Sequence, residues 1–129
     1  MGNDLSALIT ILQFVKDFGI EFLYYEDPKF KHPAFSYIPY ARKIQINKTA
    51  MEMAPFCPDN IKFFAHSLLH ELAHAIQECH GSKFERKLNL KEEKWADRFA
   101  TEVCKKFGIS GVKKFEAYVN GRYLNRGRR

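Results

Sequence analysis

The segment 59–81 constrains the fold more than any other part of the chain. Asp59 is a favourable helix N-cap, Gly81 is a typical helix terminator, and the residues between them follow helical spacing. The spacing predicts a helix over 61–79. We expect this helix to form the centre of the fold because it also carries the chain's most informative motif.

That motif is His70-Glu71-Leu72-Ala73-His74, an HExxH pattern. Positions i and i+4 of a helix lie on the same face, about one turn apart, so two imidazoles at this spacing can reach one metal ion. Glu71 lies beside them, where its carboxylate can take a proton from a water molecule. The pattern is typical of zinc peptidases when it lies on a capped helix, as it does here.

A catalytic zinc needs three protein ligands and one open position. Glu93 is the first candidate for the third ligand, because it precedes Asp97 by one helical turn on the next predicted helix. Both acidic residues lie at the edge of an apolar stripe, beside Ala96 and Ala100, whose small side chains allow two helices to approach closely. Asp97 could then orient one ligating imidazole from outside the ligand shell, or it could itself be the third ligand in place of Glu93.

Two other residues remain candidates. His80 follows His74 by six residues, a spacing found in zinc peptidases where Gly breaks the helix between the second and third His. Here Gln77 occupies the break position, and a continuous helix would turn His80 well away from the motif face. Glu92 points nearer the middle of the apolar stripe, but its spacing from Asn89 is that of a capping box.

The rest of the chain predicts an α+β domain with a short, mostly antiparallel sheet, a central HExxH helix and a packed ligand-bearing helix. Helices are predicted over 5–18, 83–88 (a single turn), 89–107 and 110–120; strands over 20–25, 34–38 and 43–47; and a loop over 49–58. One domain is expected over 1–124, followed by a basic tail over 125–129. The expected core includes Leu68, Leu72, Ile76, Trp95, Phe99 and Val103.

The composition limits the classes of protein to which the chain can belong. The 129 residues are 46% hydrophobic and 15% aromatic, which excludes a disordered chain. The three cysteines cannot all pair within the chain, no signal-peptide pattern is visible, and no apolar run is long enough for a membrane span. We therefore expect a cytoplasmic protein without a membrane partner. The net charge of +6 and the Arg-rich tail are also compatible with nucleic acid as a partner.

Several segments resemble known metallopeptidases. Residues 68–75 are similar to the metal helix of zincin-like metallopeptidases. Residues 92–100 resemble two related groups, the ArdC-type antirestriction domain of plasmid and phage polyvalent proteins and the ImmA/IrrE-type regulatory peptidases. The ArdC-type resemblance extends over roughly 34–124 and is strongest over 60–100. Trp95 departs from the regulatory peptidases, which often carry a second acidic residue there. Residues 80–84 resemble the third-ligand segment of SprT-type peptidases.

The resemblance implies a zinc-dependent peptidase with a zincin-like fold. It also implies that His70, His74 and Glu93 bind Zn²⁺ and that Glu71 is the catalytic base. Its substrate would be a protein or peptide, and an antirestriction or regulatory role is implied.

The chain also suggests where such a substrate would lie. An extended peptide could add to the edge strand near Tyr37 and Tyr40, and His66, one turn before the motif, could line the same cleft. The alternative hypothesis is a DNA-binding antirestriction module in which the zinc site is structural or vestigial.

Overall fold

The computed structural model describes residues 2–29, 34–53, 58–81 and 90–109. Within these residues the chain forms four helices and one three-stranded sheet, which confirms the α+β class. The elements in chain order are α1 (Gly2–Lys16), β1 (Glu21–Tyr25), β2 (Phe35–Ile38), β3 (Lys43–Asn47), α2 (Lys48–Met53), α3 (Pro58–Cys79) and α4 (Leu90–Lys106).

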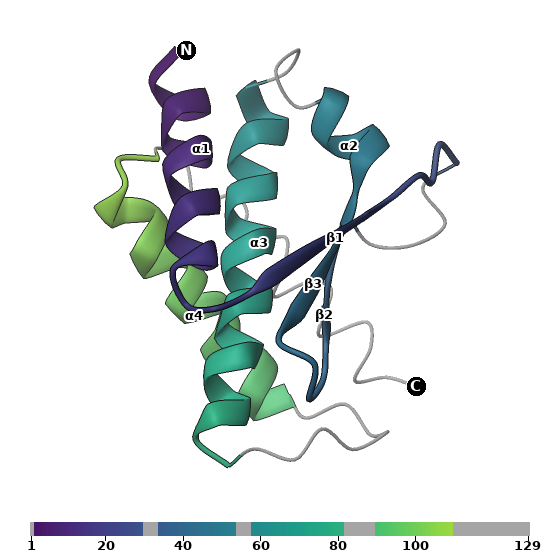
Figure 1. Cartoon of the computed structure of the whole chain (residues 1–129). Helices are drawn as coiled ribbons and strands as arrows, with labels where there is room; N and C mark the ends of the chain where they lie inside the picture. The colour runs from purple at the N-terminus through teal and green to yellow at the C-terminus, as the bar shows by residue number, and fades with distance from the viewer. Residues whose placement is uncertain (1, 30–33, 54–57, 82–89, 110–129) are drawn as a thin grey trace.

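Helix α3 is the centre of the molecule, as predicted. It packs against α1, α4 and β2, and Figure 1 shows it between α1 and the sheet. Leu68 and Leu72 are fully buried, as predicted. The largest apolar side chains that are fully buried come from three of the helices and from β3: Leu8, Ile11, Val15, Ile44, Ile46, Leu68, Leu69, Leu72 and Cys104.

The sheet is mixed rather than mostly antiparallel. Its strand order is β1-β3-β2, so β3 lies in the middle. The β2–β3 hairpin is antiparallel, whereas β1 runs parallel to β3. β2 is therefore the strand at one edge of the sheet, and this edge contacts α3.

The predicted loop over 49–58 is wrong over its first residues, which belong to α2. Asn47 acts as the N-cap of this short helix because its side-chain oxygen accepts a hydrogen bond from Thr49 N–H at 3.0 Å. Ala50 is buried in the core, so tertiary packing holds a segment whose local sequence favours a loop.

The prediction that Trp95 belongs to the core is also wrong, because its side chain is 43% exposed. The buried face of α4 is centred on Ala96, Ala100 and Cys104, all fully buried. Trp95 lies at the border of this face and stacks on Phe99 with a ring separation of 5.6 Å. Three further residues of the predicted core, Ile76, Phe99 and Val103, are partly buried against it.

Helix α4 ends where its sequence predicts. Gly108 has a φ of 79°, which lets the chain turn back on the helix. Gly108 N–H then donates to the Lys105 carbonyl, and Ile109 N–H donates to the Cys104 carbonyl. These are the two hydrogen bonds of a Schellman motif, and Ile109 is buried against the core.

Three predicted features lie outside the described residues: the helical turn over 83–88, the helix over 110–120 and the tail over 125–129. In the parts that the structure describes, none of the helices combines the length and the apolar character that a membrane crossing would require.

Candidate metal centre

The two motif histidines face one point. Their Nε2 atoms lie 3.0 Å apart on one face of α3, and the rings meet nearly at right angles. His70 is buried and His74 is partly buried, with side-chain exposures of 8% and 12%. The helical spacing of the motif produces this convergence, as the sequence predicts.

Glu93 joins them from the first turn of α4. Its carboxylate oxygens lie 3.0 Å from His70 Nε2 and 3.1 Å from His74 Nε2. The close approach of α4 to α3 is possible because Ala96 and Ala100 fill the contact with small side chains. The structure therefore brings together the three residues that the sequence singles out, and they form a group that could hold a metal ion.

The spacing of the three ligand atoms can be compared with what zinc requires. Ligand atoms at about 2.0–2.1 Å from a tetrahedral zinc lie roughly 3.3–3.4 Å from one another. The two Nε2 atoms lie 3.0 Å apart, and each lies 3.0–3.1 Å from a different oxygen of the Glu93 carboxylate, so the observed separations are shorter by a few tenths of an ångström. Small side-chain rotations would thus admit a metal ion, and the imidazole and carboxylate donors suit zinc.

Asp97 contacts the other nitrogen of His70. Its Oδ1 lies 2.5 Å from His70 Nδ1, and the side chain is buried. Within the described part of the chain, Asp97 Oδ2 accepts no hydrogen bond. Because Asp97 contacts Nδ1 of His70, it lies away from the Nε2 atoms that meet Glu93, and this is the position of an orienting carboxylate rather than of a ligand.

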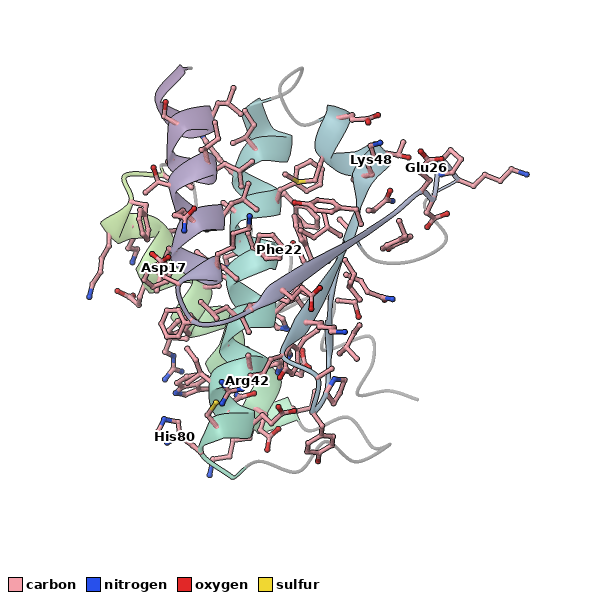
Figure 2. All side chains as sticks on the ribbon, in the orientation of Figure 1. Asp17, Phe22, Glu26, Arg42, Lys48 and His80 are labelled. Carbon is pink, nitrogen blue, oxygen red and sulfur yellow. The ribbon has the colours of Figure 1, made fainter. Side chains whose placement is uncertain are left out.

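The remaining third-ligand candidates do not join the group. His80 is exposed at the end of α3, and Figure 2 shows it pointing away from the body of the molecule. Glu92 contributes its backbone carbonyl, which accepts a hydrogen bond from Gln77 Nε2 at 2.9 Å. The ordinary helical turn through Gln77 explains the outcome for His80, since no break redirects the chain.

Glu71 is held by the edge of the sheet. Tyr37 N–H in β2 donates to Glu71 Oε2 at 2.9 Å. In an edge strand, the backbone groups of every second residue point away from the sheet. The Ala34 carbonyl accepts a hydrogen bond from Asn47 N–H of β3, so the backbone groups of Tyr37, three residues later, point away from β3. The side of β2 that points away from β3 at Tyr37 is thus the side that meets α3.

A second acidic residue of α3 anchors the same hairpin. The Glu78 carboxylate accepts one hydrogen bond from the Tyr37 hydroxyl at 2.8 Å and another from Tyr40 N–H at 2.5 Å. Tyr37 is 8% exposed and already engaged through both its backbone and its hydroxyl, whereas the Tyr40 side chain is 68% exposed. Of the two predicted substrate-binding tyrosines, the structure thus leaves only the ring of Tyr40 open to solvent.

The structure does not support His66 as a residue that lines a substrate cleft. Its side chain is 2% exposed, and Nε2 lies 3.1 Å from the Thr101 hydroxyl at the contact between α3 and α4. The position one turn before His70 faces the interior because α4 covers this part of α3.

The charges of the site act strongly on one another. Burial lowers the pKa of His70, but hydrogen bonds to Asp97 and Glu93 outweigh it and raise the pKa to about 10. The pKa of His74 is raised in the same way: burial lowers it, but the hydrogen bond to Glu93 and the nearby negative charges together have the larger effect. Burial raises the pKa of Glu93, yet its two histidine partners bring it well below its usual value.

Glu71 differs from Glu93 in the sign of its shift. Burial raises the pKa of Glu71, and the opposing effects of His70, His74 and Tyr37 N–H only reduce this increase. A carboxyl group with a raised pKa is better suited to exchange protons near neutral pH than an ordinary glutamate. The pKa values of the two glutamates are thus shifted in opposite directions, that of Glu93 downward and that of Glu71 upward.

Two residues of the site were missed by sequence reasoning. Gln77 contacts His74, and its position three residues later on the same helix could have indicated this contact. Glu78 contacts the β2–β3 hairpin, and no local pattern indicates that contact because it depends on how the sheet docks on α3.

The chain was compared with known proteins in three ways. No family model, no curated protein and no solved structure matches it.

Proposed function

We propose that this protein is a zinc-dependent metallopeptidase with a zincin-like fold. One observation carries the proposal: His70 Nε2, His74 Nε2 and the Glu93 carboxylate converge within 3.0–3.1 Å of one another, with Glu71 on the same helix. Two histidines and a glutamate leave one position of a tetrahedral zinc for water or substrate, which is the ligand set of a catalytic rather than a closed structural site.

Zinc, when bound, supplies a Lewis acid that polarises a carbonyl group and lowers the pKa of a water molecule. Glu71 takes the proton of the attacking water and later delivers it to the leaving amine. A raised pKa makes the carboxylate of Glu71 a stronger base toward that water than an ordinary glutamate. Asp97 holds His70 with its Nε2 toward the metal, and the negative charge of Glu93 balances part of the charge of the ion.

The substrate in this proposal is a peptide in extended conformation. β2 is an edge strand beside the site, and backbone groups on its free side can pair with an added strand. Tyr37 N–H is already bonded to Glu71, so pairing on this side would use the backbone groups of the alternate residue, Phe35, because those of Ser36 and Ile38 face β3. The exposed ring of Tyr40 lies on the turn that follows.

Two substitutions separate metal binding from catalysis. Glu93→Ala should lose most of its zinc, measured by elemental mass spectrometry on the purified protein. Glu71→Gln should keep zinc at the wild-type level and cleave peptide substrates about 10²–10⁴-fold more slowly. Glu102→Ala, which removes an exposed glutamate from the same helix as Glu93, is the matched control and should change neither. Undiminished cleavage by Glu71→Gln would refute the proposed mechanism.

A second candidate function, nucleic-acid binding, has one supporting observation. The outward side of α4 carries exposed basic residues at positions three to seven residues apart: Lys91, Lys94, Arg98 and Lys105. Phosphate contacts predict binding that weakens steeply with salt. Labelled single- and double-stranded DNA should bind at about 50 mM salt and dissociate at higher salt, and the double substitution Lys94→Glu with Arg98→Glu should weaken it. No binding at low salt would eliminate this candidate.

A further inference from the structure

Gln77 connects the second histidine of the motif to the helix that carries Glu93. Its Oε1 lies 2.9 Å from His74 Nδ1, and its Nε2 donates to the Glu92 backbone carbonyl at 2.9 Å. The side chain is partly buried between α3 and the first turn of α4. One amide group therefore contacts both a ligand and the residue immediately before another ligand.

The chemistry of the partners fixes where the protons lie. A backbone carbonyl can only accept, so the NH₂ group of Gln77 faces Glu92 and the amide oxygen faces His74. An amide oxygen also only accepts, so Nδ1 of His74 must carry the hydrogen. In the neutral imidazole, Nε2 is then the atom with the free lone pair, and it faces His70 and Glu93.

The two histidines are thus oriented by different means. Asp97 orients His70 with a buried carboxylate, whereas Gln77 orients His74 with a neutral amide. The site already contains the carboxylates of Glu71, Glu93 and Asp97, and another buried negative charge would carry a desolvation cost. A neutral acceptor gives His74 the same tautomer without that charge.

We propose that Gln77 is a positioning residue that holds His74 in the Nδ1–H form and ties it to the first turn of α4. As a result, His74 and Glu93 are presented to the metal together, and metal binding is coupled to the docking of α4 on α3. The inference rests on the proposed metal site and adds to it the residue that orients the second ligand.

Three variants test the assignment. Gln77→Leu removes both hydrogen bonds at similar volume. Gln77→Glu keeps an acceptor for His74 and loses the donor to Glu92. Gln13→Leu is the matched control, because Gln13 is an exposed helical glutamine that donates one hydrogen bond, to Asp17.

The measurements are zinc affinity by chelator competition and the NMR signal of the His74 Nδ1–H proton. Gln77→Leu should bind zinc about 10–100-fold more weakly and lose the protected ring proton, as expected when an outer partner of a ligand is removed. Gln77→Glu should keep the ring proton but recover only part of the affinity, because it lacks the donor to Glu92 and adds a buried negative charge. Gln13→Leu should match the wild type.

The outcomes separate this inference from the proposed function. If the wild type binds no zinc, the proposed function fails and this inference fails with it. If the wild type binds zinc and Gln77→Leu binds it equally well, this inference alone is overturned. If Gln77→Leu does not fold, the decision rests on Gln77→Glu, and an affinity loss there with no protected ring proton would overturn the role of the acceptor.

Discussion

Zinc binding at this site should compete with protons well above neutral pH. In the metal-free protein, Asp97 and Glu93 outweigh the effect of burial and raise the pKa of His70 to about 10. His74 also has a raised pKa, with Glu93 as the main cause of the increase over the opposing effect of burial. A metal ligand must be deprotonated, so zinc has to displace at least one proton at neutral pH.

The magnitude follows from the position of the pKa. One proton with a pKa of about 10 weakens the apparent affinity about tenfold for every pH unit below that value. At about pH 7 the loss is roughly 1,000-fold, or about 4 kcal/mol. Where zinc also displaces a proton from His74, the affinity depends still more steeply on pH. If His70 had the ordinary pKa of about 6.5, the zinc affinity would hardly increase above about pH 7.5, because the imidazole would already be neutral.

The assay is a zinc titration against a competing chelator from about pH 6.5 to about pH 8.5, with calorimetry in two buffers of different ionisation enthalpy to count released protons. We expect the Kd to fall at least about tenfold per pH unit, and about one to two protons to be released at about pH 8. Asp97→Asn should flatten the dependence because it removes a charge that raises the pKa of His70. A wild-type affinity that is constant above about pH 7.5, without proton release, would refute the reasoning.

Three further predictions concern stability. Leu72→Ala should lower the free energy of unfolding by about 2–5 kcal/mol in urea denaturation, because Leu72 is fully buried and truncation leaves a cavity; a loss under about 1 kcal/mol would contradict that burial. Asn47→Ala should cost about 1–2 kcal/mol in the same assay, since Asn47 caps α2 through Thr49 N–H and also donates to the Asp27 carbonyl; Asn47→Asp keeps the cap but buries a carboxylate beside that carbonyl, so it should be destabilising as well. In the metal-free protein, the raised pKa of His70 contributes stability in full below about pH 6.5, and this contribution should disappear as the pH rises through about 10, seen as a falling Tm that bound zinc prevents.

The sequence predicted the parts of the site that depend on one helix at a time. The convergence of His70 and His74 follows from a four-residue spacing, and the position of Asp97 one turn after Glu93 follows from the same rule. The choice of Glu93 as third ligand needed one tertiary assumption, that α4 packs closely on α3. Small residues at the stripe of α4 indicated that contact.

The features that could not be predicted depend on contacts between distant elements. The parallel pairing of β1 with β3 has no local signal, since alternation of side chains is the same in parallel and antiparallel strands. His66 and Trp95 lie on helices whose positions in the sequence were predicted. Whether each side chain is covered depends on the angle at which α3 and α4 cross, which the sequence does not indicate. The backbone contact of Tyr37 with Glu71 depends on how the sheet edge docks on α3, and the pattern of side chains in the sequence does not indicate this.

The contacts along α3 divide the site into two halves with separate supports. In the proposed metallopeptidase, the α4 side contributes Asp97 and Glu93 to metal binding, and the sheet side, through Tyr37, holds the carboxylate of Glu71. Damage to the hairpin should therefore yield a protein that is fully loaded with metal but slow, while damage to α4 should yield one that is empty. Loading and turnover can then be lost independently, and each type of failure identifies the side of α3 on which the fault lies.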